Sequence, residues 1–179
     1  LYHFHLFDSL EWKSWDWRLN QFSHPSQAGD DVVLFLIDQE SLDIYEKDQG
    51  LPWPWPRQMY SAIIRYCQQA KVKALVFDFV FSEISNWGTE DDEDFSSAMA
   101  KAGNVFLPIF LSQSIKETEE VPFNHLEKYS LVDRKFPSQA IHSMKSASLP
   151  VENLLNSAHG LGNVKFSQDK DGIFRRIPL

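Results

Sequence analysis

Three acidic residues stand at positions where carboxylates often bind a metal ion or transfer protons. Asp38 closes one apolar run, Asp78 lies inside the next, and Glu83 follows that second run. Neighbouring parallel strands would bring such residues toward the carboxyl edge of a sheet, where α/β folds usually bind ligands. A buried Asp is also a common acceptor for backbone or Arg donors. A ligand-binding role and a structural role therefore both stay open for these acids.

A second acidic group, Asp169-Lys170-Asp171-Gly172, occurs late in the chain. An EF-hand requires further Asp or Asn residues and a Glu at fixed spacing, which this segment lacks. The acidic loop of a haloacid dehalogenase-type phosphatase requires a Lys and another acidic motif downstream, and neither follows. Asp and Gly are typical turn residues. The segment therefore predicts a turn.

The other reactive side chains give no signature of a catalytic centre. The chain has no Gly-x-Ser-x-Gly elbow for a serine nucleophile. Cys67 falls on the inward stripe of a predicted helix, where thiols are usually inert. The six histidines show no metal-ligand spacing beyond His3-x-His5. Arg175 and Arg176 alternate faces on a predicted strand. We expect no catalytic residue, no metal and no cofactor.

The segment Gly50–Tyr60 joins the first apolar run to a clearly amphipathic helix. Each proline in this segment holds φ at about −65°, which predicts a stiff, extended connector. Trp53 and Trp55 are two residues apart, so in an extended chain they lean toward the same surface. They either clamp the structure or form an aromatic wall for a small ligand. The candidate ligand-binding residues are Asp38, Trp53, Trp55, Arg57, Asp78 and Glu83, and the structural candidates here are Pro54 and Pro56.

The first half of the chain predicts a β-α-β unit. Val32–Ile37 is a continuous run of branched and other apolar residues, typical of a strand buried on both faces. A short helix over 41–47 follows, and an amphipathic helix then runs from Arg57 to Lys71. Ala74–Phe81 predicts a second buried strand. A right-handed crossover would make the two strands parallel neighbours.

The second half predicts further alternation of helices and strands. Thr89 begins a predicted helix whose first turns carry five acids, which favour the positive end of the helix dipole. Val105–Leu111 is a predicted strand in which Pro108 favours an edge position or a bulge. Ser148–Pro150 begins another short helix. A hairpin of 161–166 and 173–179 closes the chain.

These elements predict an α/β fold in a single domain. The central sheet is mixed and mostly parallel, with helices on both faces and a C-terminal β-hairpin. Residues 1–22 carry many Trp and His side chains and predict a membrane-proximal helix, and 23–179 form the α/β domain. The polar stretch 112–148 is too long for a bare loop, so we expect an excursion with short elements over one edge of the sheet.

The charge and length of the chain exclude several classes of protein. With 25 acidic and 17 basic side chains, the net charge is −8, which repels phosphate backbones and excludes nucleic acid as a partner. The apolar runs are far shorter than the roughly 18 residues that a membrane-spanning helix needs. The chain lacks an initiator Met and ends directly after a predicted strand, so we expect a fragment of a longer protein with any membrane segment outside it.

Several short segments together form a combination typical of one family. They are Trp53-Pro54-Trp55-Pro56-Arg57, Asp78 within its apolar run, Ala102-Gly103-Asn104-Val105, Gly162-Asn163-Val164, Asp169-x-Asp171-Gly172 and Arg175-Arg176-Ile177-Pro178-Leu179. The chain closely resembles the type-two CHASE domain, a cyclase- and histidine-kinase-associated sensory extracellular domain. Asp16-Trp17-Arg18 is similar to the Asp-x-Arg in the first helix of that family. The resemblance spans nearly the whole chain, with 112–148 as the stretch that does not match.

The resemblance implies an extracytoplasmic (periplasmic or extracellular) sensory domain of a bacterial inner-membrane receptor. Such domains usually follow one membrane helix and precede several others. The implied output, an adenylate or guanylate cyclase, a histidine or Ser/Thr kinase or a cyclic-dinucleotide enzyme, lies outside this chain. The expected partners are an unknown small-molecule or mechanical signal, the receptor's own transmembrane helices and, in a homodimer, a second copy.

Two other functions stay open at this point. The first is a metal-dependent hydrolase that uses Asp38, Asp78, Glu83 and Asp171, which predicts a bound divalent cation. The second is a dimerisation or partner-docking module in which the 112–148 excursion supplies the interface.

Overall fold

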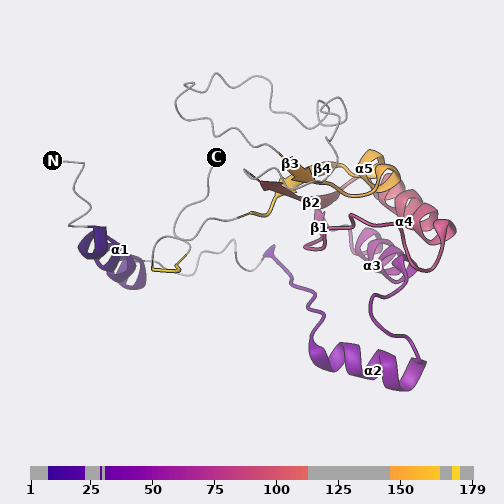
Figure 1. The fold of residues 1–179 in the computed structure, drawn as a ribbon, viewed down its shortest axis with the longest axis horizontal. Helices are drawn as coiled ribbons and strands as arrows, with labels where there is room; N and C mark the ends of the chain where they lie inside the picture. Colours follow the sequence, from indigo (N-terminus) through magenta and orange to yellow (C-terminus); the bar gives the residue numbers. More distant parts are fainter. Residues whose placement is uncertain (1–7, 23–28, 30, 113–145, 166–170, 174–179) are drawn as a thin grey trace. The chain divides into compact units, whose positions relative to one another are not determined.

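The computed structural model describes residues 8–22, 29, 31–112, 146–165 and 171–173. The chain divides into two compact units, Leu1–Trp53 and Pro54–Leu179, which are described separately below. Figure 1 shows the helices and strands of both units in sequence colours. Among the described helices, none combines the length and the apolar character that crossing a membrane would demand.

The described part of the first unit contains two α-helices, α1 (Asp8–Phe22) and α2 (Gln39–Gln49). The short helix predicted over 41–47 is confirmed and is longer than predicted. Asp38 caps α2, because its Oδ1 accepts hydrogen bonds from the backbone N–H of Ser41 at 2.9 Å and from the Ser41 hydroxyl at 2.7 Å. These bonds from Ser41 lower the pKa of Asp38. The helix ends at Gly50, whose φ of 62° is the left-handed conformation that favours glycine.

The predicted strand at Val32–Ile37 is wrong. The structure gives this segment no strand pairing, and the side chains from Val32 to Leu36 are exposed. The composition of the run is that of a buried strand, but a strand also needs the backbone of a second strand beside it. Composition alone therefore did not fix the state of this segment.

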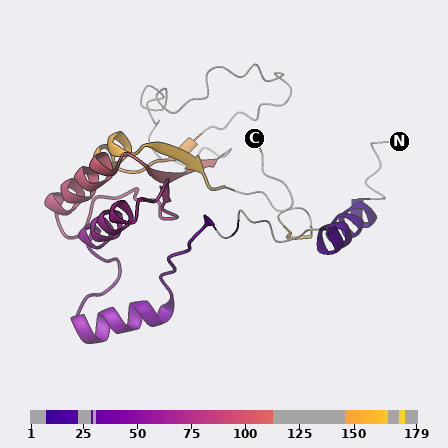
Figure 2. The same ribbon diagram turned by 180° about the vertical axis from the view of Figure 1, so that it is seen from behind.

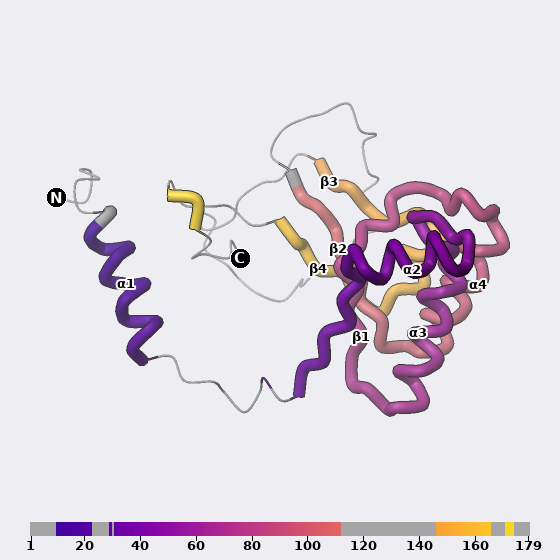
Figure 3. Tube along the Cα trace, turned by 90° about the horizontal axis from the view of Figure 1, so that it is seen from below, coloured from indigo at the N-terminus to yellow at the C-terminus, as the bar shows by residue number. Residues whose placement is uncertain are grey.

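The second unit is built around one four-stranded sheet. Its elements are α3 (Arg57–Gln69), β1 (Leu75–Val76), α4 (Thr89–Ala102), β2 (Val105–Ser112), β3 (Ser146–Ser148), α5 (Glu152–Ser157) and β4 (Gly160–Asn163). The strand β2 pairs in parallel with β1 and β4 and antiparallel with β3. Figure 3 shows β2 beside β3 and β4. The predicted α/β class with a mostly parallel sheet is confirmed.

Pro108 does not place β2 at an edge, contrary to prediction. The ladder between β1 and β2 proceeds until the N–H of Phe77 donates to the carbonyl of Phe106 at 3.1 Å. The next bond of a parallel ladder would need an N–H from Pro108, which proline lacks. On its other side β2 stays paired with β4, where Pro108 is in register with Gly162. The proline therefore shortens β1 to two residues and leaves β2 central.

The segment predicted as a fully buried strand at Ala74–Phe81 buries only alternate residues. Phe77 and Phe81 are buried, whereas Val76 is 69% exposed and Asp78 is exposed. This alternation is the pattern of a strand with one face on the core. The predicted buried strand is therefore buried on one face only.

An aromatic cluster joins the sheet to the two longest helices of this unit. The ring of Tyr60 on α3 lies 5.6–6.0 Å from the rings of Phe77, Phe79, Phe81 and Phe95, measured between centroids. Phe95 belongs to α4, which lies beside α3 in both Figure 1 and Figure 2. Edge-to-face and tilted contacts of this kind add to the stabilisation from burial. The core of the unit therefore lies between α3, α4 and the Leu75–Phe81 segment.

The second half of the chain follows its prediction in part. Thr89 is the first residue of α4, and Gly103, with φ of 67°, ends it. The short helix predicted after Ser148–Pro150 is α5, whose Leu154 and Leu155 are buried. The ends of the polar excursion meet, since Ser112 and Ser146 are paired in β2 and β3, while 113–145 lie outside the described residues. Most of the predicted hairpin also lies outside them.

The buried hydroxyl of Tyr60 generates a prediction about alkaline stability. Burial raises the pKa of Tyr60 to about 12 from an ordinary value of 10.0. Between pH 10 and about 12 the unfolded chain loses this proton while the folded chain keeps it, so the free energy of unfolding falls as pH rises. Below pH 10 the hydroxyl keeps its proton in both states, so it adds no pH dependence to the free energy of unfolding. Urea unfolding across this pH range should show a smaller loss of stability for Tyr60→Phe than for the parent chain.

The matched control is Tyr66→Phe, because Tyr66 lies on the same helix and is 62% exposed. This variant should follow the parent chain over the same pH range. Equal pH profiles for all three proteins would contradict the raised pKa.

Candidate functional site

The start of α3 is capped by a side chain from another helix. Pro56 directly precedes α3, with φ of −55°, and supplies no side-chain hydrogen bond to the helix. Asp91 on α4 takes that role: its two oxygens accept the backbone N–H of Arg57 at 2.7 Å and of Gln58 at 2.8 Å. A carboxylate at the N-terminus of a helix is favoured by the unsatisfied N–H groups and by the dipole. Asp91 therefore fixes α4 against the beginning of α3.

The next residue of α4 forms a buried ion pair. The guanidinium of Arg57 donates from Nη1 to Oδ1 of Asp92 and from Nη2 to the carbonyl of Glu83. The side chains of Arg57 and Asp92 are 8% and 3% exposed. The guanidinium also lies over the ring of Phe81, 5.3 Å from its centroid. Burial lowers the pKa of Arg57 and the charges of Asp92 and Asp91 oppose that shift, so the guanidinium stays protonated.

The same two carboxylates hold the loop that precedes α4. The backbone N–H of Ser85 donates to Oδ2 of Asp92 at 3.1 Å, and the Ser85 hydroxyl donates to Asp91. The hydroxyl oxygen in turn accepts the backbone N–H of Trp87 at 3.2 Å. The indole N–H of Trp87 donates to the carbonyl of Pro54 at 3.1 Å. The network therefore joins the Trp-Pro connector, the loop and both helices.

This arrangement is suited to holding structure rather than to chemistry. Both oxygens of Asp91 and both oxygens of Asp92 accept hydrogen bonds. Each Asp is 2% exposed. A general base needs an accessible oxygen within reach of the proton that it removes. Neither carboxylate offers one, so the network positions its neighbours and leaves ligand contact to other residues.

The two tryptophans of the connector differ in their exposure to solvent, contrary to prediction. Trp55 is 7% exposed, whereas Trp53 is 46% exposed. Trp55 directly precedes Pro56 and α3, and it turns into the core of the second unit. Trp53 belongs to the first unit. The expectation that both lean against one surface is therefore wrong.

The three acids predicted as ligand-binding candidates, Asp38, Asp78 and Glu83, have separate surroundings. Asp38 caps α2 in the first unit. Asp78 and Glu83 are exposed in the second unit, where Glu83 contributes its carbonyl to Arg57. Among the residues that the structure describes, no group of three or more His, Cys, Asp or Glu side chains could hold a metal ion. The described residues therefore give the hydrolase hypothesis no support.

Several residues of the family motifs have local roles. Arg18 on α1 donates from Nε to the carbonyl of Ser14 at 3.2 Å, and its guanidinium lies 5.6 Å from the ring centroid of Trp15. Asp16, on the same helix, is half-buried.

The predicted Asp-Gly turn is partly described. Oδ1 of Asp171 accepts the N–H of Ile173 at 3.3 Å, and Gly172 has a φ of 84°. These features agree with a turn. The remaining predicted motif residues, Asp169, Arg175 and Arg176, lie outside the described residues.

Sequence reasoning missed Asp91 and Asp92 as partners of Arg57. It interpreted both as acids that favour the positive end of the helix dipole in the first turns of a helix. A signal was present, because Asp91 precedes the buried Phe95 by four residues and Asp92 precedes it by three, so all three share one face of α4. Acids on the apolar face of a helix are buried and must find donors. The missed partners Ser85 and Trp87 gave no comparable signal.

The buried ion pair generates a prediction about stability. Asp92→Asn keeps the size of the side chain but leaves the charge of Arg57 buried without its partner. Losing one partner of a buried ion pair should lower the free energy of unfolding by about 3–5 kcal/mol. The matched control is Asp94→Asn, because Asp94 forms an exposed ion pair with Arg65 at 3.7 Å on the same helix. That change should cost at most about 1 kcal/mol.

Urea denaturation, followed by circular dichroism, measures both differences. Equal losses for the two variants would show that the pair of Arg57 and Asp92 does not organise this unit.

The comparisons with known proteins place the chain in one family. Among protein-family models, the CHASE2 domain matches residues 1–179, the whole chain. A search of curated proteins and a search of solved structures gave no match. The match covers the Trp-Pro connector and the buried network that it helps to build. The chain belongs to the CHASE2 family of sensory extracellular domains.

Proposed function

We propose that this chain is the signal-input domain of a bacterial transmembrane receptor, lies outside the cytoplasm, and controls a cyclase or a kinase that other parts of the receptor supply. The observation that carries the proposal is the family match over the whole chain. The described residues support a sensory role over a catalytic one, since their buried carboxylates are all engaged in hydrogen bonds.

The position of the connector supports a route for the signal. The boundary between the two units falls between Trp53 and Pro54, inside the Trp-Pro repeat. Proline-rich connectors are extended and semi-rigid, so they pass a displacement along the chain with little loss. Beyond that boundary, the connector is fixed at Pro54 by Trp87 and at Arg57 by Asp91 and Asp92. We infer that the signal passes along this connector to α3 and α4.

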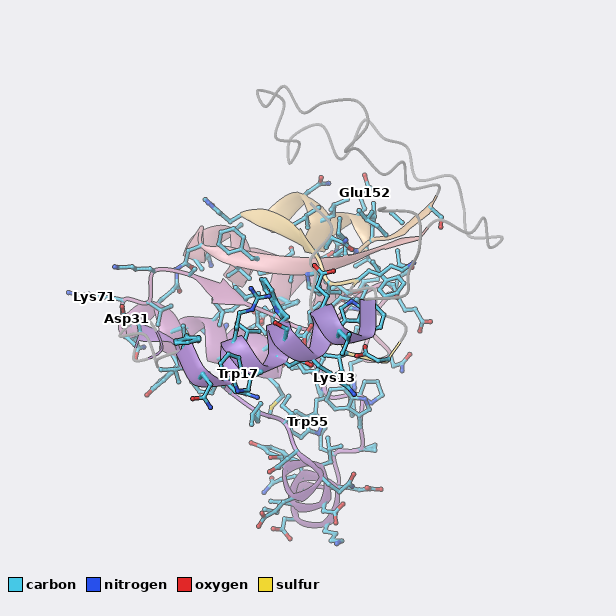
Figure 4. All side chains as sticks on the ribbon, turned by 90° about the vertical axis from the view of Figure 1, so that its left-hand side faces the viewer. Lys13, Trp17, Asp31, Trp55, Lys71 and Glu152 are labelled. Atoms are coloured by element: carbon cyan, nitrogen blue, oxygen red, sulfur yellow. The ribbon has the colours of Figure 1, made fainter. Side chains whose placement is uncertain are left out.

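The location of the domain can be tested with a cysteine at an exposed position. The chain has one native cysteine, Cys67, which is 3% exposed. Glu152 is exposed on α5 and is labelled in Figure 4. In the full-length receptor, Glu152→Cys should react with a membrane-impermeant maleimide added to intact bacteria whose outer membrane has been permeabilised. The experiment uses a receptor in which every cysteine outside this chain has been replaced by Ser. Without the Glu152→Cys change this receptor should not react, because Cys67 is buried.

Reaction of the Glu152→Cys receptor only after the inner membrane is broken would place the domain in the cytoplasm and overturn the proposal. A cysteine in a known cytoplasmic enzyme of the same cells serves as the control for membrane integrity.

A further inference from the structure

The loop between β1 and α4 presents two large apolar side chains to solvent. Ile84 is 65% exposed and Trp87 is 49% exposed. Ser85, which lies between them in the sequence, bonds to both buried carboxylates of the network. A tight turn closes the loop, with the N–H of Gly88 donating to the carbonyl of Ser85 at 3.2 Å. The two apolar side chains therefore stand on a support that the buried charges hold in place.

The polar groups of Trp87 are already used inside the protein. Its indole N–H donates to the carbonyl of Pro54 and its backbone N–H donates to the hydroxyl of Ser85. The part of the side chain that meets solvent is therefore apolar ring, with a π face that attracts cations. Because these bonds already restrict the ring, binding costs little additional entropy. Fixed aromatic side chains of this kind are typical of binding hot spots.

Two exposed acids lie close to this pair in the sequence. Glu83 directly precedes Ile84, and Glu90 lies in the first turn of α4; both are exposed. Neither forms an ion pair with another residue in the described part of the chain. The whole chain carries a net charge of −8. The field around the loop therefore repels phosphate groups and anionic lipids and attracts cations.

The size of the apolar surface limits the kind of partner. The exposed parts of Ile84 and Trp87 together offer on the order of 200 Å². A stable interface between globular proteins buries about 800 Å² on each partner. The surface is therefore too small for a second folded domain or a second copy of this chain, and it fits a short segment with one or two anchoring side chains.

We propose that Ile84 and Trp87, with Glu83 and Glu90 at their rim, bind a short cationic peptide segment in which an aliphatic or aromatic side chain lies next to Lys or Arg. The apolar side chain of the segment packs on Ile84 and on the ring of Trp87. The cation pairs with the rim carboxylates or lies over the indole. The inference concerns the chain itself and does not depend on the topology of the receptor.

The test is a titration of the 179-residue chain at low salt with three blocked hexapeptides. One alternates Lys and Leu, one alternates Lys and Ser, and one alternates Glu and Leu. Isothermal titration calorimetry should detect binding of the Lys-Leu peptide that is at least tenfold tighter than binding of either other peptide. Added salt should weaken it, because exposed charges are screened.

Variants locate the binding surface. Ile84→Ser should weaken binding of the Lys-Leu peptide about tenfold, and Glu83→Gln and Glu90→Gln should each weaken it about two- to fivefold. Two controls change equivalent groups elsewhere. Tyr66→Ser removes another exposed aromatic side chain, and Glu152→Gln removes another exposed acid. Both controls should bind like the parent chain.

Trp87→Phe tests the indole while keeping an aromatic ring, and it should also weaken binding. Thermal unfolding of each variant shows whether the fold is retained. Trp87 is exposed, but its indole N–H holds the carbonyl of Pro54, so Trp87→Phe can loosen the loop. The other substituted side chains make no side-chain hydrogen bond to another described residue. If Trp87→Phe loosens the loop, the Ile84→Ser result decides the test.

Three results would overturn the proposal. The first is equal binding of the Lys-Leu and Lys-Ser peptides, which would indicate charge attraction alone. The second is equal loss of binding in Ile84→Ser and Tyr66→Ser. The third is an absence of peptide binding together with binding to vesicles of phosphatidylglycerol, which would make the loop a membrane-contacting surface. None of these results bears on the location of the domain, which the maleimide experiment tests separately.

Discussion

The second unit depends on two adjacent carboxylates that are buried at the start of α4. Asp91 caps α3, and Asp92 pairs with Arg57. A buried ion pair adds little net stability compared with a well-packed apolar pair, but removing one partner is expensive. The network therefore acts mainly by excluding other arrangements: any shift of α3 along α4 would leave a buried charge or a helix N-terminus without its partner. It sets the register of the two helices that carry the aromatic core.

The proline before α3 explains why one carboxylate is enough to cap this helix. Pro56 has no N–H, so the first two backbone donors of the helix belong to Arg57 and Gln58, and Asp91 accepts both. The next N–H, that of Met59, donates to the carbonyl of Pro56 at 3.0 Å. All the donors of the first turn thus have partners, although no residue of the connector supplies a side-chain cap. Pro56 leaves two backbone donors at the start of α3, those of Arg57 and Gln58, and the distant Asp91 supplies the two acceptors.

The helices could be predicted from the sequence because their signals are local. The spacing of apolar residues, Thr89 at one end of α4 and Gly103 at the other lie within one segment each. The strands were harder, because pairing joins distant segments: Val32–Ile37 has the composition of a strand without pairing, and Pro108 acted on the length of β1 rather than on the place of β2. The site was hardest, since Arg57 and Asp92 are 35 residues apart. The apolar face of α4 indicated that its acids are buried, but nothing in the sequence named their partner.

The Trp53–Arg57 segment, on which the resemblance to the family rests, also helps to hold this unit together. Trp55 is buried, Arg57 is paired, and Pro54 accepts the indole of Trp87. The motif is thus a requirement of the fold, and a chain can carry it whatever ligand it senses. We infer that recognition of a ligand depends on side chains that the motif supports but does not include. Ile84 and Trp87 are in that position, because the same buried charges that fix the connector hold their loop while leaving their side chains in solvent. In this architecture a family can keep its core and vary what it senses by changing exposed loop residues.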